Sequence, residues 1–156
     1  MSAALTGFAS SFLKPQIDPV GLARIYYDFA VAQVGATAMS ALLDAFRAIQ
    51  TQPQQDIANG LLETSAATPS RQALIAESIV AMWYLGAWYI PGAQGGGGFP
   101  PTPLQIISSE AYTNGLVWNA MQSHPMGYSA FTFGYWSQQP GPLSTFGVNS
   151  GKGGGQ

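Results

Sequence analysis

The sequence predicts an all-α protein: about five short helices in an irregular bundle, with a glycine-rich loop and an extended aromatic C-terminal arm. Two observations carry this prediction. Apolar residues recur at the three- and four-residue spacing of a helix face through most of residues 2–121. Prolines and glycines divide that region into short segments. The chain has 156 residues, of which 47% are apolar, and this is enough to bury a core without disulfide bonds.

The first helices follow from start and stop signals. Ser2 is expected to cap a short helix that ends before Pro15, and Asp18, followed by proline, indicates the start of the next helix. Gly35 is expected to interrupt or bend that helix, and Pro53 begins a weaker helical segment that runs to residue 62. The apolar stripes of the two helices around the glycine are Leu22, Ile25, Tyr26 and Phe29, then Met39, Leu42, Leu43, Phe46 and Ile49.

The strongest helix prediction covers residues 69–89 and begins after Thr68. From Ile79 onward this segment is apolar on nearly every side, so it must be covered on every side, and in a chain this small part of the cover can come from outside. Residues 104–121 predict another helix, although Gly115 weakens the pattern. Its apolar positions are Ile107, Tyr112, Leu116 and Met121.

Loops and the C-terminal region complete the predicted organisation. Residues 91–103 form a loop that contains four consecutive glycines and then two prolines. After Pro125 the glycines and prolines exclude a long helix. The predicted parts are therefore a helical domain over residues 1–124, an extended partner-binding arm over 125–150 and a flexible tail over 151–156. The aromatic residues that carry the arm prediction are Tyr128, Phe131, Phe133, Tyr135 and Trp136.

Charge is scarce and unevenly distributed. Asp, Glu, Lys and Arg make up only 8% of the chain, against roughly 25% in an ordinary soluble domain. Ten charged residues lie within residues 1–77, whereas residues 78–151 hold only Glu110 together with all four tryptophans. Charge depletion with aromatic enrichment is typical of a protein interface. An aromatic core, or a low-charge secreted surface, would give the same composition.

Composition also excludes several kinds of site. The chain has no cysteine, so thiolate metal ligation, iron–sulfur clusters and cysteine nucleophiles are impossible. Five basic residues without a cluster argue against nucleic-acid binding. The run Gly95–Gly98 lacks the lysine and the strand–loop–helix setting of a phosphate-binding loop. The segment Ile79–Ile90 is shorter than the roughly 20 residues that span a membrane. No cofactor or metal is expected on this chain.

Two further interpretations stay open beside a partner-binding role. The aromatic residues could form the carbohydrate-binding surface of a self-contained secreted module, although core or interface packing is commoner. An enzyme could use Glu110, His124 and a tyrosine, but no nucleophile elbow is present. A polar contact near an interface is the favoured interpretation for His124. Glu110, alone in a long uncharged region, is expected to be buried with a hydrogen-bonding or ionic partner.

Three motifs, in order along the chain, carry a resemblance to a known family. They are Trp83-Tyr84-Leu85-Gly86, then Tyr112-Thr113-Asn114-Gly115-Leu116-Val117-Trp118, and finally Pro125-x-Gly127-Tyr128 followed by Gly134-Tyr135-Trp136 and Pro140. The set resembles the small subunit of bacterial membrane-bound FAD-dependent sugar and polyol dehydrogenases, the sorbitol, fructose and glucose dehydrogenases. The resemblance covers residues 70–140 well and 5–50 loosely. This chain departs from the family at Met82 and Gly115, where alanine is usual, and at Ser129, where many members have cysteine.

The resemblance implies a role without catalysis. In this family the small subunit holds no cofactor; it binds and stabilises a large glucose-methanol-choline-type subunit, which carries FAD and often an iron–sulfur cluster. A multihaem cytochrome c subunit accepts the electrons. The small subunit typically carries a twin-arginine export signal, which no part of this sequence matches, so a periplasmic location, peripheral to the inner membrane through the complex, is an expectation from the resemblance. The expected partner-binding residues are Trp83, Tyr84, Tyr112, Trp118, Tyr128, Tyr135 and Trp136.

Overall fold

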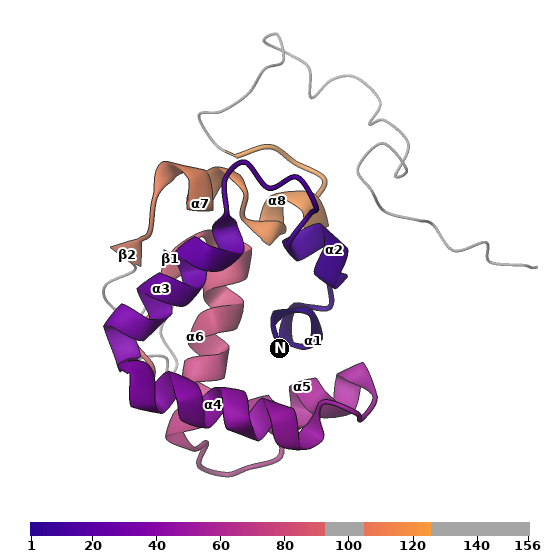
Figure 1. Ribbon diagram of the computed structural model, residues 1–156, viewed down its shortest axis with the longest axis vertical. Coiled ribbons are helices and arrows are strands. Elements are labelled where there is room, and N and C mark those ends of the chain that lie inside the picture. The colour runs from indigo at the N-terminus through magenta and orange to yellow at the C-terminus, as the bar shows by residue number, and fades with distance from the viewer. Residues whose placement is uncertain (93–104, 126–156) are drawn as a thin grey trace, which may run out of the picture.

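The computed structural model describes residues 1–92 and 105–125, and these ranges form an all-α bundle with one very small sheet (Figure 1). The predicted fold class is therefore confirmed. The glycine run, the predicted arm and the predicted tail lie outside the described residues. The elements are α1 (Ser2–Thr6), α2 (Ser10–Leu13), α3 (Leu22–Val34), α4 (Ala36–Ile49), α5 (Gln54–Leu62), α6 (Arg71–Leu85), β1 (Ala87–Trp88), β2 (Gln105–Ile106), α7 (Ser109–Thr113) and α8 (Leu116–Ala120).

Helix α6 is the centre of the bundle. Helices α1, α3, α4, α5, α7 and α8 all contact it, and β1 continues directly from its end (Figure 1). Other segments of this chain therefore cover the apolar surface of α6 over much of the length of the helix. Seven of its residues are buried: Ala73, Ile75, Ala76, Ser78, Ile79, Met82 and Trp83.

Helices α3 and α4 form a sharp elbow around one edge of the bundle (Figure 1). Their axes are bent by 119°, and the residue between them, Gly35, has φ 87° and ψ 151°. Residues with a Cβ atom rarely adopt this backbone conformation, so the glycine at this position permits the sharp turn between the two helices. The predicted interruption at Gly35 is confirmed.

Several predicted helix starts are wrong by a few residues. Helix α3 begins at Leu22, not at Asp18; the Asp18 Oδ1 instead accepts a hydrogen bond of 2.6 Å from the Gly21 backbone N–H. The carboxylate thus stabilises the turn before the helix rather than the helix itself. At α6 the N-cap is Ser70, whose hydroxyl accepts a hydrogen bond from the Ala73 N–H, so the helix starts two residues later than the proline suggested.

The two long helices predicted for the second half are both shorter than expected. Helix α6 ends at Leu85 because Gly86 adopts a left-handed conformation, φ 63°. The next residues form β1, which pairs with β2 in an antiparallel arrangement that matches Ala87 with Ile106. The predicted helix over 104–121 is broken into β2, α7 and α8, since Gly115 has an extended ψ of 134° between the two helices.

Candidate partner-binding site

The first two sequence motifs lie side by side in the structure, at the end of α6 and along α7 and α8. A Cβ atom placed on Gly86 would lie 2.3 Å from the Ala111 carbonyl oxygen and 2.5 Å from the Tyr112 nitrogen. No real Cβ atom tolerates such distances, so only glycine lets the end of α6 approach the backbone of α7 this closely. The Ile107 N–H also donates a hydrogen bond of 3.1 Å to the Gly86 carbonyl oxygen.

Gly115, in the second motif, makes a matching close approach to the first. Its added Cβ would lie 2.7 Å from the Tyr84 carbonyl oxygen. The family pattern has alanine here, and in this chain an alanine would require the backbone to shift. The departure from the pattern is therefore consistent with the packing of this particular structure. The two motifs, 26 or more residues apart in the chain, form one packed unit.

Aromatic side chains of these two motifs form hydrogen bonds and ring contacts with other parts of the chain and with each other. The Tyr84 hydroxyl donates a hydrogen bond of 2.9 Å to the Thr6 carbonyl oxygen, and its ring meets Phe8 edge-on with centroids 6.2 Å apart. The Trp118 Nε1–H donates a hydrogen bond of 2.7 Å to the Tyr112 carbonyl oxygen, and these two rings also meet edge-on at 5.4 Å. Tyr84, Tyr112 and Trp118 all keep part of their surface exposed.

Trp83 differs from Tyr84, Tyr112 and Trp118 because it is buried, with 5% of its surface exposed. Its ring packs edge-on against Tyr26, with centroids 4.8 Å apart. The Tyr26 hydroxyl lies 3.4 Å from the Ala111 carbonyl oxygen, and burial raises the pKa of this phenol, which keeps it protonated as a donor. The burial of Trp83 therefore needs no partner protein.

A groove runs beside the two motifs, between α2, the segment before α3, and α8. We call it the motif groove. Its volume is about 230 Å³. Its floor is mainly apolar, and its polar groups are carboxylate and amide side chains, an arrangement that resembles the apolar centre and polar rim of protein interfaces. The residues that line it are Phe12, Leu13, Pro15, Asp18, Pro19, Val20, Leu22, Trp83, Asn114, Leu116 and Asn119.

Phe12 is the most prominent aromatic side chain of the motif groove. It keeps 45% of its surface exposed, although its ring lies near Phe8 with centroids 5.3 Å apart. No local sequence pattern predicts a binding role for Phe12, because the groove forms only where α2 and α8, about 100 residues apart in sequence, line the same hollow.

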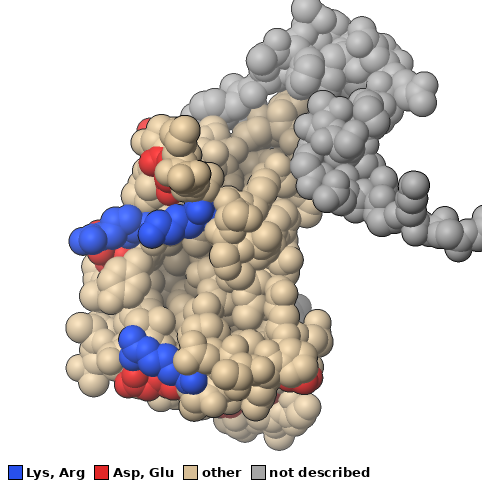
Figure 2. All heavy atoms as spheres, turned by 45° about the vertical axis from the view of Figure 1, so that its right-hand side comes forward, with Lys and Arg blue, Asp and Glu red and all other residues tan. Residues whose placement is uncertain are grey.

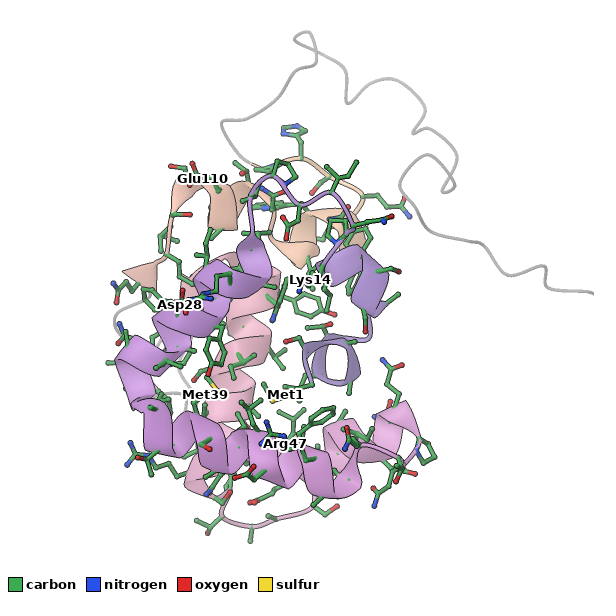
Figure 3. All side chains as sticks on the ribbon, in the orientation of Figure 1. Met1, Lys14, Asp28, Met39, Arg47 and Glu110 are labelled. Atoms are coloured by element: carbon green, nitrogen blue, oxygen red, sulfur yellow. The ribbon has the colours of Figure 1, made fainter. Side chains whose placement is uncertain are left out.

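Glu110 is exposed, and the prediction of a buried acid is wrong. It lies in the first turn of α7, on the outer surface of the molecule (Figure 3). A hydrogen bond from its own backbone N–H and one from the Ser108 hydroxyl lower the pKa of its carboxyl group. An acid in the first helical turn also interacts favourably with the helix dipole, so Glu110 is stable without a cationic partner.

The remaining charges of the described residues lie mostly at the surface. Figure 2 shows one face that is largely free of charge, with charged side chains gathered toward one side. Two exposed ion pairs account for part of these groups: Arg24 with Asp28, and Arg47 with Asp44, each at 2.6 Å. In each pair the opposite charges of two neighbouring side chains on one helix cancel. The pair therefore leaves little net charge to attract a charged ligand.

Three observations bear on metals, membranes and the enzyme interpretation. Within residues 1–92 and 105–125, no three acidic or histidine side chains gather closely enough to hold a metal ion. In the same ranges no single helix is long and apolar enough to cross a membrane; only the bent pair α3 and α4 meets that length and composition together. The ring nitrogen Nδ1 of His124 lies 3.0 Å from the Pro125 carbonyl oxygen.

Comparison of the chain with known protein families, with curated proteins and with solved structures found no match. The family resemblance therefore stays a prediction from the three motifs. Two of these motifs are described by the structure and pack together. The third motif, with the predicted partner-binding residues Tyr128, Tyr135 and Trp136, lies outside the described residues.

Proposed function

We propose that this chain is a non-catalytic accessory subunit that binds and stabilises a glucose-methanol-choline-type FAD subunit of a sugar or polyol dehydrogenase. The observation that supports this proposal best is that both described motifs contribute to one groove. Trp83 comes from the first motif, and Asn114 and Leu116 come from the second. Trp83 and Leu116 are buried beneath this groove, whereas Asn114 is exposed. The residues behind the resemblance thus support a surface that a partner can contact.

The chemistry of the motif groove is suited to an apolar segment of a partner protein. Phe12 supplies exposed apolar surface above the buried side chains of Leu13 and Leu116, and Asn119 supplies an amide that can donate and accept hydrogen bonds. Large aromatic side chains in such grooves commonly carry much of the binding energy of an interface. In the proposed complex, FAD and any iron–sulfur cluster belong to the large subunit, and haem c belongs to a cytochrome subunit.

Co-expression with the neighbouring flavoprotein gene tests the proposal. The tagged chain should co-purify with a yellow, FAD-containing subunit that oxidises a sugar or polyol, and the flavoprotein made alone should be less soluble. The proposal fails if the chromosomal neighbours encode no such flavoprotein, or if the two proteins elute separately at micromolar concentration. If the chain elutes alone and binds a soluble polysaccharide, the secreted carbohydrate-binding module becomes the better interpretation.

A pair of matched variants tests whether the motif groove is the contact surface. Phe12→Ser removes an aromatic side chain that is 45% exposed in the groove. Ile106→Ser removes an apolar side chain that is 48% exposed on β2, on the other side of the bundle (Figure 1). Phe12→Ser should weaken the complex by about tenfold or more, in the range of an interface hot spot, whereas Ile106→Ser should leave affinity unchanged. Equal effects of the two variants would rule out the groove.

The export role is a further part of this proposal. If the chain escorts the flavoprotein to the periplasm, deletion of its gene should leave the flavoprotein in the cytoplasm. Full dehydrogenase activity in the periplasm of the deletion strain would contradict the escort role but not the binding role, because the two are measured separately.

A further inference from the structure

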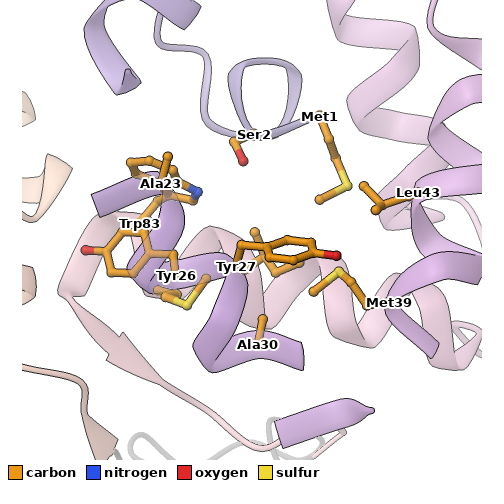
Figure 4. Close-up of a pocket in the computed structure, with 11 residues that line it drawn as sticks. Met1, Ser2, Ala23, Tyr26, Tyr27, Ala30, Met39, Leu43 and Trp83 are labelled. Atoms are coloured by element: carbon orange, nitrogen blue, oxygen red, sulfur yellow. The ribbon is translucent and has the colours of Figure 1, made fainter. Parts of the chain in front are cut away.

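A second concave site lies in the middle of the bundle, away from the motif groove except for one shared residue, Trp83. We call it the central cavity. It lies between α1, α3, α4 and α6 and has a volume of about 200 Å³ (Figure 4). Tyr27, one of its lining residues, is 47% exposed, so this side of the cavity lies close to the molecular surface. The lining residues are Met1, Ser2, Ala23, Tyr26, Tyr27, Ala30, Met39, Leu43, Ile79, Met82 and Trp83.

The lining defines the class of molecule that fits. No Asp, Glu, Lys, Arg or His side chain lines the central cavity, so no side chain there offers an ionic partner to a charged ligand. Met1, which lines the cavity, also carries an α-amino group, and burial lowers the pKa of that group, so its charged form is disfavoured. Burying an unpaired charge there would be costly. Three thioethers, from Met1, Met39 and Met82, lie around it, and methionine adapts its shape to aromatic rings and contacts them favourably. The site therefore favours an uncharged ring.

The cavity also has polar groups on two sides. Figure 4 shows the Tyr27 hydroxyl near Met39, on the side away from Trp83. Figure 4 shows the nitrogen edge of the Trp83 indole ring turned toward the cavity, on the side where the Ser2 hydroxyl lies. The Tyr26 hydroxyl points away, since it lies 3.4 Å from the Ala111 carbonyl oxygen. An indole N–H is only a donor, so its natural complement in a ligand is an acceptor oxygen.

We propose that the central cavity is a binding site for a small, uncharged aromatic molecule that carries one acceptor oxygen, such as a simple phenol. The volume supports this size, because an apolar cavity of about 150 Å³ is known to bind benzene, and this one is somewhat larger. The site is distinct from the proposed partner contact at Phe12, so it does not depend on the proposed function.

Titration of the full chain with p-cresol, followed by NMR of methionine methyl groups, tests the proposal. The sequence has five methionines, of which three line the central cavity. Ring-current shifts should appear at Met1, Met39 and Met82 and saturate with one common Kd, roughly 0.1–1 mM for a ligand of this size. Met121, which is 65% exposed outside the cavity, should not shift. Absence of saturable shifts, or equal shifts at Met121, would overturn the proposal.

Chemical and genetic controls sharpen the result. Benzoate, a charged ring of similar size, should bind at least about tenfold more weakly than p-cresol, because no cationic side chain lines the cavity and burial disfavours the charged form of the Met1 α-amino group. Ala23→Leu fills the cavity from α3 and should abolish the shifts, whereas Ala32→Leu, at an exposed position of the same helix outside the lining, should preserve them. Circular dichroism verifies that each variant is folded. Benzoate binding equal to that of p-cresol, or p-cresol binding retained in folded Ala23→Leu, would refute the assignment.

Discussion

At the residue scale, two glycines determine how the motifs meet. Gly86 and Gly21 both have left-handed backbone, with φ of 63° and 68°, but only Gly86 lies against another segment. A Cβ on Gly21 would meet nothing within 4 Å. Substitution of Gly21 therefore measures the free-energy cost of a left-handed backbone alone, whereas substitution of Gly86 adds the cost of a collision with the backbone of α7.

Gly86→Ala should destabilise the protein much more than Gly21→Ala. The left-handed conformation alone costs an alanine about 1–2 kcal/mol, which is the expected loss for Gly21→Ala. Gly86→Ala adds a collision with the Ala111 carbonyl group and should cost about 1–3 kcal/mol more. Urea denaturation of both variants measures the difference in the free energy of unfolding. Equal losses would mean that α6 and α7 are not in close contact.

For the aromatic and acidic side chains of the second half, the sequence does not predict which are buried and which are exposed. Trp83 and Glu110 were both given partner-related roles, because sequence shows neither burial nor helix position. In the structure Trp83 packs on Tyr26 inside the chain, and Glu110 occupies an exposed first helical turn. Burial depends on tertiary contacts, so a scarcity of charge along the chain did not show which residues are inside.

At the scale of elements, the sequence predicts the helix boundaries well at Gly35 and Pro53 but misplaces the starts of α3 and α6. The elbow at Gly35 and the start of α5 after Pro53 both follow from the backbone preferences of glycine and proline. The β1–β2 pair was missed because each strand has only two residues and its partner lies across a loop. The break at Gly115 was noted only as a weakness, since helical periodicity continues on both sides of it.

The connection between α5 and α6 depends on one acidic side chain. The Glu63 carboxylate, at the end of α5, accepts a hydrogen bond of 2.7 Å from the backbone N–H of Ser70, the N-cap of α6. The Ser70 side chain and this backbone N–H lower the pKa of Glu63 from its usual 4.5. The carboxylate form is thus favoured in the folded state.

This contact should make part of the stability depend on pH. A carboxyl group whose pKa is lowered by folding contributes its full stabilisation above its unfolded pKa, and the contribution disappears as the pH falls through the folded pKa. Glu63→Gln should therefore lower the Tm at pH 7 by a small amount, because the group is exposed, and the difference from the wild type should shrink steadily below pH 4.5. Thermal unfolding from pH 7 to pH 3 measures it, and a difference that is constant with pH would contradict the assigned role.

At the scale of the whole molecule, the balance between charge and apolar surface is unusual. The net charge is −2 on 156 residues, and the two exposed ion pairs of the described residues are each neutral. Six large apolar side chains of the described ranges are nonetheless exposed: Phe12, Ile17, Tyr27, Ile90, Ile106 and Met121. Low net charge removes the repulsion that keeps copies of a protein apart.

The isolated chain should therefore self-associate as its concentration rises, and a bound flavoprotein should suppress this. Ile17, 85% exposed, is the most accessible large apolar side chain among the described residues, so Ile17→Glu should reduce association by removing apolar surface and making the net charge more negative, without disturbing the core. Ala45→Glu, on the exposed face of α4, adds the same charge without removing large apolar surface and serves as the matched control. Sedimentation velocity over a range of concentrations compares the three proteins. A smaller effect of Ala45→Glu would assign the association to apolar contact, equal effects would assign it to charge alone, and a wild-type chain that stays monomeric at high concentration would refute the prediction.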